Sequence, residues 1–155
     1  DVVDGGREGM IEEQIPVFAA ASGVPESDLV ERVHRVWTRT VARVATVEDA
    51  SAAVDNGVDA VVAQGTESGG HRSYGTKRAR TDAAGQSTLT LVPHMVDAVG
   101  DRVPVIAAAG IVDGRGLAAM LALGADGVPL GGRFAATHES LASPGWKQRM
   151  ATGDT

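Results

Sequence analysis

The stretch RTVARVATVEDASAAVDNGVDAVVA, residues 39–63, contains a complete strand–helix–strand unit. Residues 39–46 and 58–63 are short and largely apolar, which favours strands that are buried on both faces. Between them lies a helical segment, with Thr46 where an N-cap is preferred and Gly57 where a glycine ends a helix. Because strands joined through a helix run parallel, this stretch predicts a βαβ unit.

The same alternation continues on both sides of this unit. Apolar runs and helical spacings predict further strands at 15–23, 103–110 and 125–132, and helices at 25–37, 90–99, 114–124 and 133–140. Five strands alternating with helices indicate an α/β fold with a parallel sheet. Such a sheet is either an open doubly wound sheet or the later part of a (β/α)8 barrel, which needs eight strands and about 250 residues.

Composition and charge limit the kinds of function. The 155 residues include no cysteine and carry a formal net charge of −6 at pH 7. Thiolate chemistry is therefore excluded, and a reducing, cytoplasmic location is favoured. The charges form no basic stripe for nucleic acid, and no apolar run approaches the roughly 18–20 residues of a membrane span. We expect residues 1–155 to form one domain of a larger protein, because the chain begins at Asp1 rather than methionine.

Three glycine-rich loops follow predicted strands: QGTESGGH at 64–71, AGIVDGRG at 109–116 and GGRF at 131–134. Ligands of parallel sheets bind beyond the carboxyl ends of the strands, where glycine lets backbone N–H groups approach them. The last two loops follow consecutive strands, and the second opens into a short helix, as at the phosphate sites of barrels. Gly110, Gly131 and Gly132 are therefore candidate phosphate-binding residues, although each loop alone could equally be an ordinary turn.

Of the four histidines, only His71 stands among glycines at a strand end. Its neutral imidazole could act as a general base near pH 7, and Glu67 either orients it or faces solvent. His34 is predicted to lie on a solvated helix face. With no cysteine and no paired histidines, no metal site is predicted. A basic cluster, which is either a lid over an anionic substrate or simply a solvated loop, consists of Lys77, Arg78 and Arg80.

Three motifs occur in the order and at the spacing found in the nitronate monooxygenase (2-nitropropane dioxygenase-like) family. They are DAVVAQGTESGGH at 59–71, VPVIAAAGIVDGRGLAAMLALGADGV at 103–128 and GGRF at 131–134. The chain resembles this family from about residue 15 to its end. The resemblance implies an FMN-dependent (β/α)8 barrel, of which this chain would supply about the fourth to eighth strands. It also implies an alkyl nitronate or nitroalkane as the small-molecule substrate, with O2 as the second substrate.

The resemblance further implies roles for particular residues. His71 matches a family histidine that is implicated as a base or as a polar partner of the nitro group. Gln64 matches a glutamine that contacts the flavin, and Gly69 and Gly70 match glycines whose backbone approaches it. The residues that match the phosphate side of the family site are Gly110, Leu130, Gly131 and Gly132.

Three positions on the phosphate side differ from the family pattern. Ala109 stands where the family usually has glycine, and Gly132 stands where it usually has threonine. Pro129 replaces a usual glutamine and, within a strand, would remove a hydrogen-bond donor from the ladder. We expect these differences to affect FMN binding more than they affect His71.

Three functional interpretations follow. The first is the oxidation of alkyl nitronates by O2 to a carbonyl compound and nitrite. The second is an FMN-dependent enoyl-thioester (enoyl-ACP) reductase or an NAD(P)H-dependent flavin reductase of the same superfamily, which would use the same flavin residues. The third is that the isolated chain is a non-catalytic fragment that cannot bind flavin alone, because a sheet that cannot close keeps an unpaired edge and exposed apolar surface.

Overall fold

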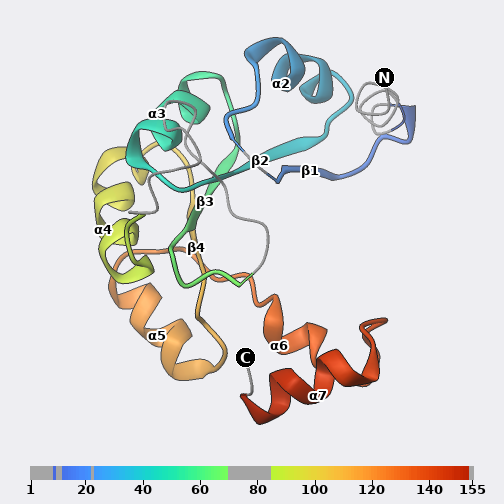
Figure 1. The fold of residues 1–155 in the computed structure, drawn as a ribbon. Helices are drawn as coiled ribbons and strands as arrows, with labels where there is room; N and C mark the ends of the chain where they lie inside the picture. Colours follow the sequence, from blue (N-terminus) through green and yellow to red (C-terminus); the bar gives the residue numbers. More distant parts are fainter. Residues whose placement is uncertain (1–8, 10–11, 22, 70–84, 154–155) are drawn as a thin grey trace.

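The computed structural model of the chain describes residue 9 and residues 12–21, 23–69 and 85–153. Its centre is a twisted sheet of four parallel strands in the order β1-β2-β3-β4 (Figure 1). The strands are β1 (Val17–Ala20), β2 (Arg39–Val44), β3 (Ala60–Gln64) and β4 (Val105–Ala108). A doubly wound sheet reverses its strand order at a switch point, whereas a barrel keeps neighbouring strands consecutive in sequence. The observed order is that of a partial (β/α)8 barrel, as predicted.

Helices follow the strands along the outer side of the sheet (Figure 1). They are α2 (Ser27–His34), α3 (Val47–Asp55), α4 (Thr88–Val99) and α5 (Gly114–Ala122). Each agrees with a helix expected from the sequence to within a few residues. Within the described ranges, no helix combines the length and apolar character that crossing a membrane requires.

The ends of α3 confirm the local signals in the βαβ unit. Thr46 is its N-cap, and the Thr46 side chain accepts a hydrogen bond of 3.1 Å from the backbone N–H of Asp49. Gly57 follows the helix at φ +93°, a conformation that an L side chain rarely adopts. The two residues thus fix where the helix begins and where the chain turns into β3.

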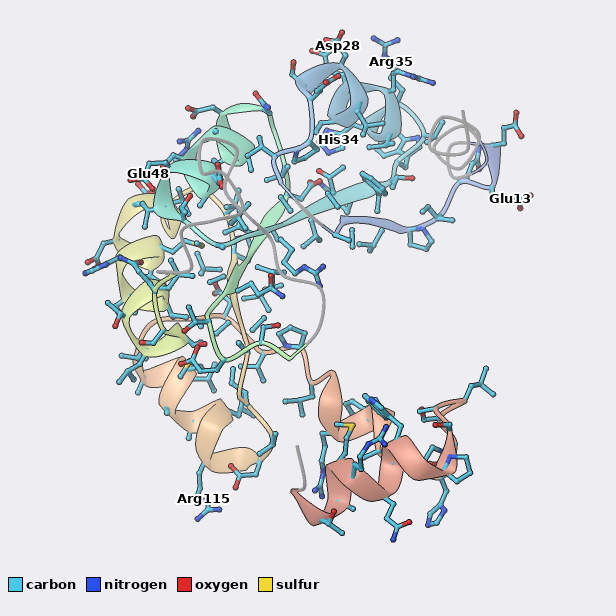
Figure 2. All side chains as sticks on the ribbon, viewed as in Figure 1. Glu13, Asp28, His34, Arg35, Glu48 and Arg115 are labelled. Carbon is cyan, nitrogen blue, oxygen red and sulfur yellow. The ribbon has the colours of Figure 1, made fainter. Side chains whose placement is uncertain are left out.

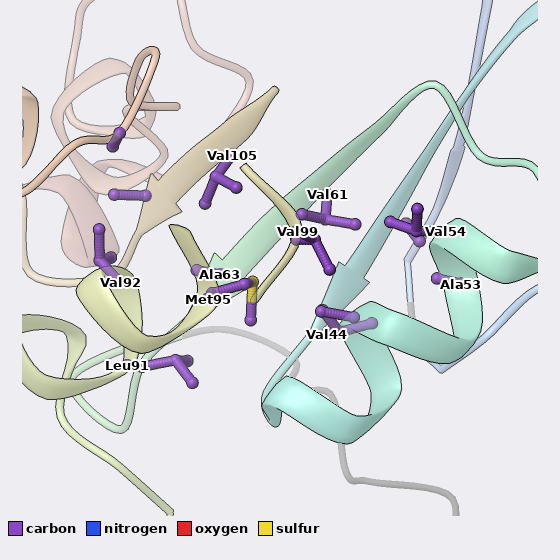
Figure 3. Packing of buried hydrophobic residues seen from close by; sticks show 14 of the residues in the cluster. Val44, Ala53, Val54, Val61, Ala63, Leu91, Val92, Met95, Val99 and Val105 are labelled. Carbon is purple, nitrogen blue, oxygen red and sulfur yellow. The ribbon is translucent and has the colours of Figure 1, made fainter. Parts of the chain in front are cut away.

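The hydrophobic core lies between the sheet and the helices (Figure 3). Alternate strand residues point into it, among them Val44 of β2, Val61 and Ala63 of β3 and Val105 of β4. From the helices, α4 contributes the most large side chains that are fully buried, namely Leu91, Val92, Met95 and Val99. The opposite face of the sheet, which carries Val41, Val62 and Ile106, is only partly buried, as expected for the lumen side of an incomplete barrel.

The strand predicted at 125–132 forms only a single parallel bridge, between Ile106 and Gly127. Asp126 N–H donates to the carbonyl of Val105 at 2.8 Å, and Ala107 N–H donates to that of Gly127 at 2.9 Å. In a regular parallel ladder a residue that donates to one carbonyl accepts from the N–H two residues further along the same neighbouring strand, so residue 129 would donate to the carbonyl of Ala107. Pro129 has no N–H, and the expectation of a fifth full strand was wrong for that reason.

The C-terminal helices also differ from expectation. The helix predicted at 133–140 is the short α6 (Gly132–Ala135), and α7 (Pro144–Thr152) follows it, where no helix was predicted. Ser143 caps α7 and Pro144 occupies its first turn, a start signal that is present in the sequence. Figure 1 shows both helices set to one side of the sheet.

Candidate functional site

The predicted site loops all begin at the same side of the sheet, where the strands end. Gln64 ends β3 and lies in register with Ala108, which ends β4. The loop that contains Gly131 and Gly132 comes shortly after Gly127, which forms a bridge with Ile106 of β4. The structure therefore brings the starts of the three glycine-rich loops to the carboxyl ends of neighbouring parallel segments, where ligands of such sheets bind.

Gln64 is held in a fixed position at this edge. Its side chain is buried, with 5% of the residue exposed, and its Nε2 donates a 2.9 Å hydrogen bond to Ser68 Oγ. A buried amide with a fixed orientation can present its oxygen or its N–H groups to a ligand at low entropic cost. This geometry suits the flavin contact that the resemblance implies for Gln64.

Glu67 does not simply face solvent. Its two carboxylate oxygens accept hydrogen bonds from the backbone N–H of Thr88, at 3.1 and 2.9 Å, and Oε2 also accepts from Thr88 Oγ1 at 2.8 Å. Burial tends to raise the pKa of the Glu67 carboxyl, but hydrogen bonds from Thr88, from the backbone of Glu67 itself and from the Thr66 side chain together outweigh it, and the pKa lies below its ordinary value. Glu67 therefore acts as an ionised cap of α4.

The backbone after β4 adopts a conformation that glycine favours. Gly110 has φ +67°, which explains its residue type without any ligand. The preceding Ala109 has φ +118°, a region that residues with a Cβ rarely adopt. Such strain costs on the order of 1–3 kcal/mol and is concentrated at functional sites. The family glycine that Ala109 replaces would not carry this strain.

The other phosphate-side residues, Leu130, Gly131 and Gly132, lie on and before α6. The side chain of Leu130 is partly buried and packs against the hydrophobic core. Gly131 is the residue before α6, and a Cβ built there would have no protein atom within 4 Å. A Cβ at Gly132 would lie 3.1 Å from Met150 Cε of α7.

These glycines provide a test of whether a cofactor fits. A Cβ at Gly69 or Gly131 would meet no protein atom within 4 Å, so packing within the described residues does not require glycine at either position. Open backbone at a strand's carboxyl end is what a flat ring or a phosphate group needs for close approach. The residues present therefore fit a nucleotide-like cofactor.

Several predicted residues lie outside the described ranges: Gly70, His71, Lys77, Arg78 and Arg80. Their predicted roles stay predictions.

Sequence reasoning missed Arg43, which lies near the carboxyl end of β2 on the lumen side of the sheet. Its Nε donates a 2.8 Å hydrogen bond to the carbonyl of Ala21, just after β1, and Nη2 donates to the same oxygen. The signal was available, since Arg43 stands between the buried apolar residues Ala42 and Val44 and its charge cannot join the core.

A second polar cluster lies at the opposite, amino end of the strands. Asp59 Oδ2 accepts hydrogen bonds from the backbone N–H of Thr40 at 2.7 Å and its Oγ1 at 3.1 Å, and lies 2.8 Å from His34 Nε2. Asp59 Oδ1 accepts from Arg39 Nη1 at 2.6 Å. His34 lies on the side of α2 near the sheet (Figure 2) and bonds Asp59, while 36% of its side chain stays exposed, so its predicted position on a solvated face holds only in part.

Burial tends to raise the pKa of the Asp59 carboxyl, but the hydrogen bonds from Thr40, Arg39 and His34 outweigh it. The pKa falls from 3.8 to about 2. Because this cluster lies at the end of the sheet that serves stability in barrels, we regard it as structural.

Comparison with known proteins decides the family. The family model for nitronate monooxygenase matches residues 8–154. The chain belongs to the nitronate monooxygenase family. A probable nitronate monooxygenase of Staphylococcus saprophyticus subsp. saprophyticus is 38% identical over 142 residues, which are 92% of this chain and 39% of that protein. One of Staphylococcus aureus is 40% identical over 134 residues, or 86% of this chain and 37% of that protein. The chain thus spans about two fifths of the curated relatives that it matches.

Solved structures with a similar fold agree with this family assignment. Nitroalkane oxidase from Streptomyces ansochromogenes matches with a TM-score of 0.87 and 38% identity, covering 94% of this chain and 42% of that chain. FabK from Thermotoga maritima matches with a TM-score of 0.82 and 36% identity, again over 94% of this chain and 42% of that chain. Because the match covers only 42% of each of these structures, this chain of the nitronate monooxygenase family corresponds to part of a larger barrel.

Proposed function

We propose that this chain forms the flavin-binding part of an FMN-dependent nitronate monooxygenase, which oxidises alkyl nitronates with O2 to a carbonyl compound and nitrite. The observation that carries the proposal is the family match over residues 8–154. The open glycine backbone at the carboxyl edge of the sheet supports it. A single domain over residues 1–155 and a cytoplasmic location belong to the same proposal.

The chain's own residues would divide the work as follows. Gly110, Leu130, Gly131 and Gly132 would offer backbone N–H groups to the FMN phosphate. The buried amide of Gln64 and the backbone at Gly69 and Gly70 would hold the ring. When bound, FMN supplies the electron transfer from the nitronate and the reaction with O2.

His71 would deprotonate a neutral nitroalkane at the carbon next to the nitro group, or donate a hydrogen bond to a nitro oxygen. The two roles make different demands, because a nitronate has already lost that proton. In the protein with its complete barrel, we expect His71→Asn to reduce turnover of neutral nitroalkane more than turnover of nitronate. Unchanged rates on both substrates would remove His71 from the mechanism.

Cofactor binding is tested directly on the 155-residue chain. We expect titration of the purified chain with FMN to quench the flavin fluorescence to a defined stoichiometry. If the chain binds no FMN, the interpretation as a non-catalytic fragment holds for the isolated chain. Stoichiometric flavin would contradict that interpretation.

A reductase of the same superfamily is the second candidate, and the similarity to FabK fits it. The TM-scores of 0.82 and 0.87 are too close for the fold to discriminate. Reduction kinetics without oxygen discriminate instead. Rapid bleaching of the bound flavin by NADH or NADPH would favour a reductase, whereas slow bleaching would favour the monooxygenase.

A further inference from the structure

We propose that Glu67 is a positioning residue, whose hydrogen bonds to Thr88 fix the loop after β3 (residues 64–69) against the turn after β4 (residues 108–110). We refer to this contact as the Glu67–Thr88 latch. The inference rests on the proposed function, because these two segments carry Gln64, Gly69 and Gly110.

The latch replaces a local helix cap with a distant one. Ser87 is the N-cap residue of α4, but its side chain makes no cap hydrogen bond and instead lies 3.1 Å from Thr90 Oγ1. One backbone donor at the start of α4, the N–H of Thr88, is bonded by Glu67, 21 residues earlier in the chain. The negative charge also lies at the positive end of the helix dipole. The position of the loop after β3 is thereby coupled to the position of α4.

The same contact reaches the turn after β4. Thr88 Oγ1 lies 3.4 Å from the carbonyl oxygen of Ala109, and Gly65 N–H donates to the carbonyl of Ala108 at 3.1 Å. A Cβ built on Gly110 would lie 3.2 Å from Glu67 Cβ, so the glutamate stem packs directly on Gly110. The strained turn is therefore in contact with the latch.

The loop after β3 and the start of α4 approach each other closely at Gly65. A Cβ built on Gly65 would lie 2.1 Å from Thr88 Oγ1, 2.4 Å from Thr88 N and 2.6 Å from Glu67 Oε2. The approach of α4 to the loop requires glycine at position 65. Glu67 thus adds a link between the loop after β3, the start of α4 and the turn after β4, beside the β3–β4 ladder and the Gly65–Ala108 hydrogen bond.

The test compares Glu67→Gln with Asp113→Asn in the 155-residue chain. Asp113 caps α5 through the backbone N–H groups of Arg115 and Gly116, at 3.0 and 3.1 Å, so its loss is a matched loss of a carboxylate cap at the same end of the sheet. We expect Glu67→Gln to weaken FMN binding about tenfold, since a charged hydrogen-bonded group is lost from a shared contact. Asp113→Asn should leave the FMN dissociation constant within about twofold.

Thr88 variants give the second measurement. Thr88→Ser keeps the hydroxyl and should bind FMN as wild type does, whereas Thr88→Val removes it and should weaken binding in the same direction as Glu67→Gln. Combining Glu67→Gln with Thr88→Val should weaken binding by less than the product of the two single effects, because both remove the same contact. Equal FMN affinity in Glu67→Gln and Asp113→Asn would overturn the proposal, as would independent effects of the two latch substitutions.

Hydrogen exchange separates failure of the latch from failure of the proposed function. We expect the amides of Gly65 and Thr88 to lose protection in Glu67→Gln but not in Asp113→Asn. If the wild-type chain binds no FMN, the proposed FMN site of the isolated chain fails, and loss of protection at both amides still supports the latch. Unchanged protection at Gly65 and Thr88 contradicts it whether or not FMN binds.

Discussion

Two carboxylates tie together distant elements at opposite ends of the same sheet. At the amino end, Asp59 joins β2 and α2 to the start of β3, and its side chain is 19% exposed. At the carboxyl end, Glu67 joins the loop after β3 to α4. Each accepts the backbone N–H and the hydroxyl of one threonine, Thr40 or Thr88.

The surroundings of the two carboxylates differ. Asp59 also pairs with Arg39 and lies beside His34, so its charge is compensated within the protein. Glu67 is instead closely approached by the backbone of Gly65 and Gly110, and the strained Ala109 precedes Gly110. Strain and open backbone reduce stability and are tolerated where they serve a ligand. We infer that the amino-end cluster stabilises the fold, whereas the carboxyl-end cluster arranges a site.

The largest effect is expected for Asp59→Asn. The substitution keeps the shape but removes the charge that three neighbouring residues bond, and we expect it to lower the free energy of unfolding by about 2–3 kcal/mol. Urea denaturation followed by circular dichroism measures this. The control is Asp55→Asn, which breaks a more exposed pair with Arg102 and should change the stability by less than about 0.5 kcal/mol. Equal effects in the two variants would refute the structural role of the amino-end cluster.

The pH dependence of stability sharpens the same contrast. The Asp59 pKa is about 2 in the folded chain and 3.8 without these contacts, so ionised Asp59 stabilises the fold above pH 4. This contribution, about 1–2 kcal/mol after allowance for solvent screening, is lost as the pH falls from about 4 to about 2. The difference in stability between wild type and Asp59→Asn should therefore shrink over this pH range. A constant difference from pH 6 to pH 2 would show that the Asp59 charge contributes nothing.

Ala109→Gly should act in the opposite direction, at the carboxyl end. At φ +118° glycine relieves the backbone strain that alanine carries. Glycine also raises the entropy of the unfolded chain, which offsets part of this effect, so we expect the free energy of unfolding to rise by about 1 kcal/mol. For a chain of this size, the gain corresponds to a rise in Tm of about 2–4 °C, measurable by calorimetry. The same substitution at Ala119 within α5 should instead destabilise by about 1 kcal/mol. A loss of stability in Ala109→Gly would show that position 109 is not strained.

At both ends of the sheet the sequence predicts the local structure but not the long-range contacts. Local signals located the βαβ unit at residues 39–63, including the cap at Thr46 and the turn at Gly57. They also identified most of α4, which was predicted at 90–99 and is observed at Thr88–Val99. Local signals could not show that Glu67 replaces a local cap, because the contact joins residues 21 apart and depends on how α4 packs. The pairing of His34 with Asp59, 25 residues away, was missed for the same reason.

Two further differences between the predicted and the observed elements have causes that are visible in the sequence. The start of α7 at Ser143 and Pro144 carries an ordinary cap signal that was overlooked. Pro129 was recognised as unfavourable in a strand, yet a strand was still predicted across it, because the apolar pattern continues on both sides. Here one missing N–H outweighed the hydrophobic pattern, since a ladder needs a donor at every second residue.

The smallest effect tests that explanation directly. Pro129→Gln restores the N–H and should allow the segment after Gly127 to extend its pairing with β4, adding about 0.5 kcal/mol of stability and measurable exchange protection at residue 129. Pro129→Ala restores the same N–H without a side-chain amide, so equal protection in both variants assigns the effect to the backbone. If residue 129 exchanges as fast as an exposed loop amide in both variants, the missing donor did not end the strand. Added protection would instead mean that Pro129 keeps the segment before Gly131 and Gly132 from pairing, so this one residue would weaken the sheet at the edge where the proposed phosphate site lies.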